Sequence, residues 1–102
     1  MARKEHKLTP KVIGTMLYSE SDGILLETSA WYDWLEGHTT FYLESPDGSF
    51  TARQEARVGG SFWYAFRRVR RKLYKVYLGR SIDLTRERLQ QVACRLAERT
   101  QG

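Results

Sequence analysis

The fold of this 102-residue chain is most restricted by residues 59–79, which read GGSFWYAFRRVRRKLYKVYLG. Aromatic and β-branched residues favour strands, so this stretch predicts strands over residues 61–68 and 72–78. The short polar connection Val69-Arg70-Arg71-Lys72 joins them. Six of the nine residues from 67 to 75 are Lys or Arg. The sequence therefore predicts a β-hairpin that carries both aromatic and cationic side chains.

Two further strands precede this hairpin, over residues 39–44 and 49–57. The segment Ser45-Pro46-Asp47-Gly48 between them predicts a tight turn. Proline presets the φ angle of the second turn residue, and glycine suits the last position. Gly59-Gly60 then leads into the hairpin, and Gly79 ends the last strand. Four short strands joined by tight turns predict an antiparallel meander over residues 39–78.

A C-terminal helix is expected over residues 86–99, with Thr85 as its N-cap. Its apolar residues recur at helical spacing and form one stripe, which predicts packing on the sheet. The stripe consists of Leu89, Val92, Ala93 and Leu96, and Cys94 flanks it.

The N-terminal part predicts smaller elements. Residues 12–18 and 24–27 flank an Asp22-Gly23 turn signal and predict a short hairpin. A short helix over residues 30–36 is expected to be capped by Thr28 or Ser29 and to end at Gly37. Its apolar side chains share one face, which favours packing against a sheet edge over ligand stacking. These are Trp31, Trp34 and Leu35.

The predicted fold class is α+β, an antiparallel β-meander of three to four strands packed on one face by the C-terminal helix. The N-terminal hairpin and short helix are additions to it. Residues 1–11, which contain four Lys/Arg residues and Pro10, are expected to form a flexible basic arm, followed by a single domain over residues 12–102.

Charge is divided unevenly along the chain. Residues 1–50 contain four Lys/Arg and eight Asp/Glu, whereas residues 51–102 contain thirteen Lys/Arg and four Asp/Glu. The net charge of +5 is thus the sum of an acidic half and a strongly basic half. Such an asymmetry favours attraction of polyanions.

Strand alternation divides the predicted sheet into two faces. The apolar sets, which include Phe62, Tyr64, Phe66, Val76 and Leu78, are expected to lie under the C-terminal helix. The other face is then expected to present cations and flat aromatics, with Glu55 as its acid. Its candidate nucleic-acid-binding residues are Arg53, Arg57, Trp63, Arg67, Lys75 and Tyr77, and the turn adds Arg70, Arg71 and Lys72.

The segments GGSFWYAFRR and KLYKVYLG, followed by Leu84-Thr85-Arg86-Glu87-Arg88-Leu89, resemble a three-stranded-sheet-plus-helix DNA-binding fold. That fold occurs in the arm-type domain of tyrosine recombinases and in plant ethylene-response factors. The longer pattern from residue 28 to 96 resembles the N-terminal region of some large bacterial LuxR-type regulators more closely. The resemblance implies that the sheet face away from the helix enters the DNA major groove. The recombinase catalytic domain and the regulator ATPase and helix-turn-helix parts are absent from this sequence, so neither full activity is carried over.

Catalytic and cofactor signals are missing from the sequence. It has neither G-x-x-x-x-G-K-[ST] nor G-x-G-x-x-G, and its one Cys and two isolated His residues do not form a usual zinc site. We therefore expect no enzyme activity, no catalytic residues, no metal and no cofactor. The single Cys94 and the charged start without an apolar stretch favour a cytoplasmic location, with no membrane partner.

Three functions stay open from the sequence. The first is sequence- or structure-specific binding of double-stranded DNA, by a small bacterial regulatory or mobile-element accessory protein. The second is binding of RNA or single strands, in which Trp63 and Tyr77 stack unpaired bases. The third is a protein-interaction module, in which the same aromatic and basic face meets an acidic partner.

Overall fold

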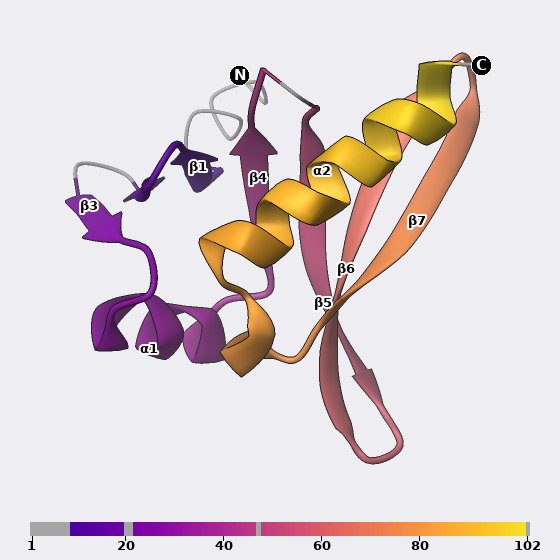
Figure 1. The fold of residues 1–102 in the computed structure, drawn as a ribbon. Helices are drawn as coiled ribbons and strands as arrows, with labels where there is room; N and C mark the ends of the chain where they lie inside the picture. Colours follow the sequence, from indigo (N-terminus) through magenta and orange to yellow (C-terminus); the bar gives the residue numbers. More distant parts are fainter. Residues whose placement is uncertain (1–8, 20–21, 47, 102) are drawn as a thin grey trace, which may run out of the picture.

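One seven-stranded sheet organises the protein, in a computed structural model that describes residues 9–19, 22–46 and 48–101 (Figure 1). The strand order is β3-β2-β1-β4-β5-β6-β7, and neighbours are antiparallel except β1 and β4. The strands are β1 (Lys11–Ile13), β2 (Met16–Ser19), β3 (Asp22–Leu25), β4 (Thr40–Glu44), β5 (Phe50–Arg57), β6 (Gly60–Val69) and β7 (Lys72–Gly79). The helices are α1 (Ser29–Gly37), the 3-10 turn η2 (Ser81–Asp83) and α2 (Arg86–Gln101).

The predicted α+β class and the meander are confirmed, since β4, β5, β6 and β7 follow one another in antiparallel order. The predicted turn at Ser45–Gly48 closes with a 3.2 Å hydrogen bond from the Gly48 N–H to the Ser45 carbonyl. The N-terminal part differs from the prediction. Gly14, at φ 63°, interrupts the expected strand over residues 12–18 and separates β1 from β2. Parallel pairing of β1 with β4 then makes the N-terminal hairpin part of the main sheet.

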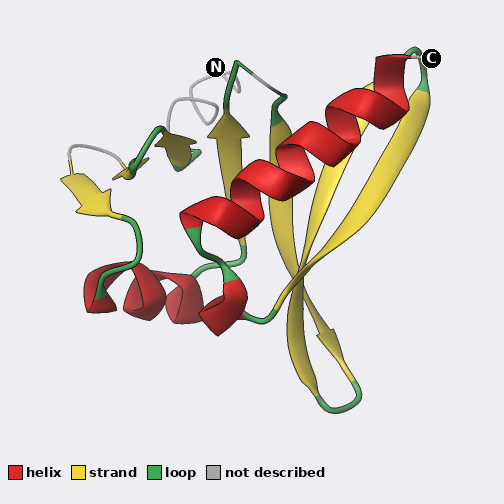
Figure 2. Ribbon diagram, viewed as in Figure 1, coloured by secondary structure: helices red, strands yellow, loops and turns green. Residues whose placement is uncertain are grey.

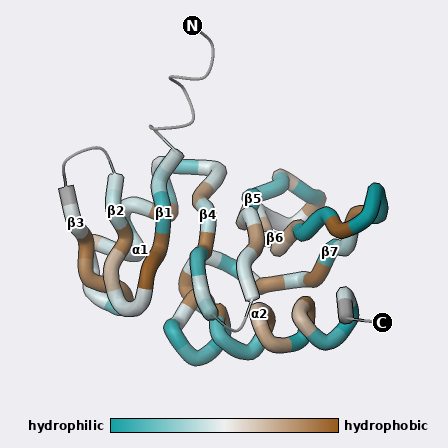
Figure 3. Tube along the Cα trace, turned by 90° about the horizontal axis from the view of Figure 1, so that it is seen from above, coloured by the Kyte–Doolittle hydropathy of each residue, from teal (hydrophilic) through white to brown (hydrophobic). Residues whose placement is uncertain are grey.

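Both helices lie on the same side of the sheet (Figure 2). The predicted apolar stripe of α2 is confirmed, because Leu89, Val92, Ala93 and Leu96 are all buried. Seen from above, α2 runs along one side of the sheet below β5, β6 and β7 (Figure 3). No described element covers the opposite side of β5–β7. We call that side the open face.

The assignment of β6 side chains to the two faces is reversed relative to the prediction. Trp63 and Ala65 are fully buried on the helix side, whereas Phe62, Tyr64 and Phe66 lie on the open face. Ala65 faces Ala52 across the β5–β6 pair, and both side chains are fully buried. The expected packing of α2 on the three aromatic residues is therefore wrong. The expected orientation of Val76 and Leu78 toward the core is confirmed.

The start of α2 is fixed from two places in the sequence. Thr85 is the N-cap, as predicted, and its Oγ1 accepts a 3.2 Å hydrogen bond from the Arg88 N–H. Glu27 lies 59 residues away, and its Oε2 accepts a 2.7 Å hydrogen bond from the Arg86 N–H. Glu27 itself has φ 65°, a left-handed conformation that is costly for a residue other than glycine. The cap supplied by its carboxylate offsets part of that cost.

The short helix α1 forms as the sequence predicts. Thr28 is its N-cap, with Oγ1 accepting from the Trp31 N–H at 3.3 Å. Its buried side chains are Trp31, Trp34 and Leu35. The Trp31 indole N–H donates to the Leu84 carbonyl at 2.8 Å, which joins α1 to the segment before α2. The aromatic pair of α1 is thus part of the core.

The predicted basic arm lies largely outside the described residues, which exclude residues 1–8. Lys11, at the end of the predicted arm, belongs to β1, and its Nζ lies 3.5 Å from Glu44 Oε1. The sheet therefore begins within the range that we predicted as the arm.

Replacing Gly48 by alanine should destabilise the protein. A Cβ at this position would lie 2.6 Å from the Ala93 carbonyl oxygen of α2, so the turn and the helix would have to separate. We expect Gly48→Ala to lower the free energy of unfolding by about 1–3 kcal/mol in urea denaturation. Gly37→Ala is the matched control, because nothing lies within 4 Å of its added Cβ and alanine is the better helix former. Equal effects of the two changes would contradict the close contact at Gly48.

Candidate nucleic-acid interface

The open face is built from alternate residues of three neighbouring strands. Register places Arg53 opposite Tyr64, and Tyr64 opposite Tyr77, while Phe66 faces Lys75. Each of these pairs lies on one side of the sheet, because directly opposite residues share a face. The side chains of the open face are Arg53, Glu55, Arg57, Phe62, Tyr64, Phe66, Arg68, Leu73, Lys75 and Tyr77.

Cations lie over the aromatic rings of this face. The Lys75 Nζ is 4.4 Å from the Tyr64 ring centroid and 5.4 Å from that of Phe66. The Arg57 Cζ lies 5.4 Å from the Tyr64 centroid, and the Arg53 Cζ 5.8 Å from the Phe66 centroid. These distances are within the range for attraction between a cation and the ring quadrupole. The rings thus restrict the positions of the cations while leaving their outer sides exposed to solvent.

Arg80 and Tyr77 extend the same arrangement toward the end of β7. The Arg80 Cζ lies 5.4 Å from the Phe62 centroid. The Tyr77 ring, 47% of whose residue surface is exposed, contacts Tyr64 at 5.6 Å and Phe62 at 6.2 Å between centroids. The aromatic side chains therefore form a connected cluster.

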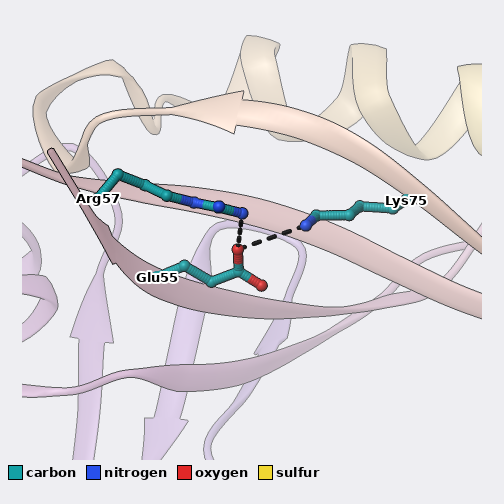
Figure 4. A network of polar contacts seen from close by, with 3 residues as sticks. All are labelled: Glu55, Arg57 and Lys75. Atoms are coloured by element: carbon teal, nitrogen blue, oxygen red, sulfur yellow. Dashed lines mark hydrogen bonds and ion pairs between the residues drawn. The ribbon is translucent and has the colours of Figure 1, made fainter.

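Glu55 is the acid within this basic surface (Figure 4). Its Oε1 accepts hydrogen bonds from Arg57 Nη2 and, at 3.3 Å, from Lys75 Nζ. Desolvation raises the pKa of Glu55, but the hydrogen bonds and charges of Lys75 and Arg57 lower it by more, so the net pKa is below its usual value. The hydrogen bond to Glu55 raises the pKa of Arg57 in turn. All three groups are therefore charged at neutral pH, and Glu55 reduces the repulsion between two neighbouring cations.

The turn between β6 and β7 carries backbone strain. Arg70 and Arg71 are the two turn residues between the paired Val69 and Lys72, and their φ angles are 53° and 72°. Two positive φ angles are typical of a type I′ hairpin turn, which usually contains Asn-Gly, Asp-Gly or Gly-Gly. Both arginines are exposed. Local folding therefore does not explain why arginine occupies these positions.

The structure brings together most of the predicted site residues. Arg53, Arg57, Lys75 and Tyr77 share the open face. Three further predicted cations lie at the exposed β6–β7 turn and are Arg70, Arg71 and Lys72, the last with its Nζ 5.4 Å from the Tyr74 ring centroid.

The predicted placement of Trp63 and Arg67 on the open face is wrong. Trp63 is fully buried, and its indole N–H donates to Ser81 Oγ at 2.9 Å. Arg67 lies on the helix side of β6, opposite Tyr74. Its Nη1 is buried and has no hydrogen-bond partner among the described residues, and a Cβ on Gly48 would lie 3.2 Å from it. Both errors have one cause, because the sequence prediction placed the more apolar set of β6 residues in the core.

Sequence reasoning missed several residues that the structure adds to the site. The correct alternation of β6 would have found Tyr64, Phe66 and Arg68 on the open face. That alternation places Trp63 in the core, where it contacts Ser81 and Phe41, and no periodicity in the sequence indicates these contacts. Arg80 follows β7 directly, and its contact with Phe62 depends on the path of the chain after Gly79.

Other kinds of site find little support in the described part of the chain. None of its helices has both the length and the apolar character needed to cross a membrane. Within the described ranges, no three His, Cys, Asp or Glu side chains gather where they could hold a metal ion. Comparison of the chain with known protein families, curated proteins and solved structures gives no match.

The orientation of β6 can be tested by stability. Trp63→Ala removes a fully buried indole, so we expect the free energy of unfolding to fall by about 3–5 kcal/mol. Tyr64→Ala removes a half-buried ring from the open face and should cost about 1 kcal/mol or less. Chemical denaturation followed by circular dichroism measures both. A larger loss for Tyr64→Ala than for Trp63→Ala would mean that the faces of β6 are exchanged.

Proposed function

We propose that this protein binds double-stranded DNA through the open face of β5–β7. The observation that carries the proposal is the set of cations held over aromatic rings on a sheet face that no described element covers. Phosphate oxygens and base edges are suitable ligands for such cations. The resemblance of the segments GGSFWYAFRR and KLYKVYLG, with the helix start at residues 84–89, to a sheet-plus-helix DNA-binding fold supports the same surface. It also favours a role as a small regulatory or mobile-element accessory protein.

The cation positions favour a duplex over a single strand. Single-stranded nucleic acids bind by stacking bases on free aromatic faces. Here Phe62, Tyr64 and Phe66 each have a cation over the ring. The alternative in which Trp63 and Tyr77 stack unpaired bases loses one of its two residues, because Trp63 is buried. The cations over these rings can contact phosphates or base edges from their outer sides, without leaving the rings.

The shape of the site also suits a duplex. The B-DNA major groove is about 12 Å wide and admits a two-stranded β-ribbon. In a groove-bound arrangement, Arg53 and Lys75 in the middle of the face would approach base edges. Arg70 and Arg71, at the end of the β6–β7 ribbon, would reach phosphates. Because the helices lie on the other side of the sheet, they do not obstruct this approach (Figure 2).

Binding to a labelled duplex should depend strongly on salt. The open face and its turn offer more cations than can reach phosphates together, so we expect about four to six phosphate contacts and a slope of log affinity against log salt near −4 to −5. Arg53→Ala should weaken binding to a preferred site by about 1–3 kcal/mol. Fluorescence anisotropy in competition with single-stranded DNA and RNA measures affinity and ligand preference together.

Arg86→Ala is the matched control for Arg53→Ala, since it removes the same charge from the helix side of the molecule. It should leave duplex affinity nearly unchanged. If Arg53→Ala, Arg57→Ala and Tyr64→Ala all bind every nucleic acid like the parent while remaining folded, the open face is not the binding surface. Preferential binding of RNA or single strands would instead favour base stacking.

The strained turn allows stability and binding to be separated. Replacing Arg70 by Asn and Arg71 by Gly supplies the residues that a type I′ turn favours, so the free energy of unfolding should rise by about 1 kcal/mol. The same double change removes two cations, so duplex affinity should fall and the salt slope should flatten by about two units. Thermal melts and anisotropy titrations measure the two effects.

Arg70→Lys keeps the charge and the strain, and serves as the control for the double change. It should retain the affinity and the stability of the parent. An unchanged affinity in the Asn-Gly variant would show that the turn does not contact the nucleic acid.

A further inference from the structure

The outer edge of β7 is a second surface that binding at the open face does not use. β7 is the last strand in the sheet order, so it pairs only with β6 among the described strands. Val69 and Lys72 flank the two-residue turn and form its hydrogen-bonded pair. Hydrogen-bonded and non-hydrogen-bonded pairs alternate from there along the two strands. The backbone N–H and C=O groups of Leu73, Lys75 and Tyr77 therefore point away from β6, toward the free edge.

A hydrogen bond from α2 agrees with this orientation. The Tyr77 carbonyl accepts from Arg88 Nη2 at 2.8 Å, and the adjacent Leu78 carbonyl accepts from Arg88 Nε at 3.0 Å. Arg88 thus occupies the end of the β7 edge. The backbone groups of Leu73 and Lys75 remain available for pairing, because no described strand lies beside them.

A groove of about 600 Å³ runs beside this edge, between β7 and α2. Its apolar part comes from Val76 and Val92, both largely removed from solvent. Arg88 and Arg95 lie two helical turns apart on α2 and line the same groove. The complete lining is Val76, Tyr77, Arg88, Gln91, Val92 and Arg95.

The charge of the groove identifies its partner. None of its described lining residues is acidic, and the acids Glu87 and Glu98 line a different hollow of α2. A second copy of this chain, pairing antiparallel through its own β7 about Lys75, would place Lys75 opposite Lys75, and like charges directly across a strand pair are destabilising. An acidic strand would instead be attracted, because cations lie along both the edge and the groove.

We propose that the β7 edge and this groove bind an acidic, extended segment of a partner protein. The segment adds to the sheet as a further strand through the backbone groups of Leu73 and Lys75. Its apolar side chains contact the partly buried Val76, and its carboxylates pair with Arg88 and Arg95. This site is separate from the proposed DNA site, because the groove lies on the helix side of the sheet.

A synthetic peptide tests the proposal on the full-length protein. The probe is a labelled eight-residue peptide of alternating Glu and Val, and the comparison probe alternates Lys and Val. We expect binding of the acidic peptide alone. Arg95→Glu should lower that affinity by about tenfold or more. Leu73→Pro should abolish it, because proline removes the edge N–H while its position on the free edge preserves pairing with β6.

Arg86→Glu is the matched control, since it makes the same charge change on the same helix outside the groove. It should leave peptide affinity unchanged. If Leu73→Pro does not fold, Arg95→Glu alone tests the proposal, because Arg95 is exposed and its replacement should leave the fold intact.

Each of the following outcomes would overturn the proposal. Equal binding of both peptides, or unchanged binding by Arg95→Glu, would remove the groove as an acidic-strand site. Loss of peptide binding in Arg53→Ala but not in Arg95→Glu would place the peptide on the open face. Dimerisation of the protein in sedimentation, lost in Leu73→Pro, would assign the edge to a second copy. A fall in duplex affinity for Arg95→Glu as large as that for Arg53→Ala would make the groove part of the nucleic-acid surface. Absence of duplex binding by the parent protein would refute the proposed DNA function and leave the peptide site unaffected.

Discussion

The buried indole of Trp63 determines what the two faces of the sheet present. Its N–H donates to Ser81 Oγ, and Ser81 also accepts from Gln54 Nε2 at 3.3 Å. Its ring lies 5.3 Å from that of Phe41 between centroids, within the aromatic core under the helices. Because side chains alternate along a strand, a buried Trp63 places Tyr64 and Phe66 outside. The aromatic and cationic character of the open face follows from this one orientation.

The elements with local signals could be predicted from the sequence. The turn at residues 45–48, the Thr28 and Thr85 caps and the apolar stripe of α2 depend on residues within a few positions of one another. The orientation of β6 could not be predicted, because both of its alternating residue sets contain aromatics. The contact of Trp63 with Ser81 that accompanies this orientation joins residues far apart in the sequence. Parallel pairing of β1 with β4 joins segments separated by β2, β3 and α1, and carries no local signal either. The face on which each candidate side chain lies was therefore predicted correctly for β5 and for Lys75 and Tyr77 of β7, and incorrectly for β6.

The open face differs from an ordinary solvated sheet in the way its charges are held. An exposed Lys or Arg usually samples many rotamers, and ordering it on binding costs free energy. Here the rings of Tyr64 and Phe66, together with the Glu55 carboxylate, restrict Arg57 and Lys75 in advance. Glu55 also competes with an incoming anion for the same two cations. A weakly matched polyanion would therefore gain less from this surface than one whose geometry lets it replace Glu55.

The contact between Glu27 and the first turn of α2 has a consequence for how the protein could be divided. The meander β4–β7 and α2 are continuous in sequence and follow the N-terminal strands. However, an N-terminal residue caps the Arg86 N–H, and Trp31 of α1 binds the Leu84 carbonyl just before the helix. A fragment lacking these residues would expose two unsatisfied backbone groups and the start of α2 would fray. Transfer of the open face to another scaffold would therefore require new partners for the Arg86 N–H and the Leu84 carbonyl, in place of Glu27 and Trp31.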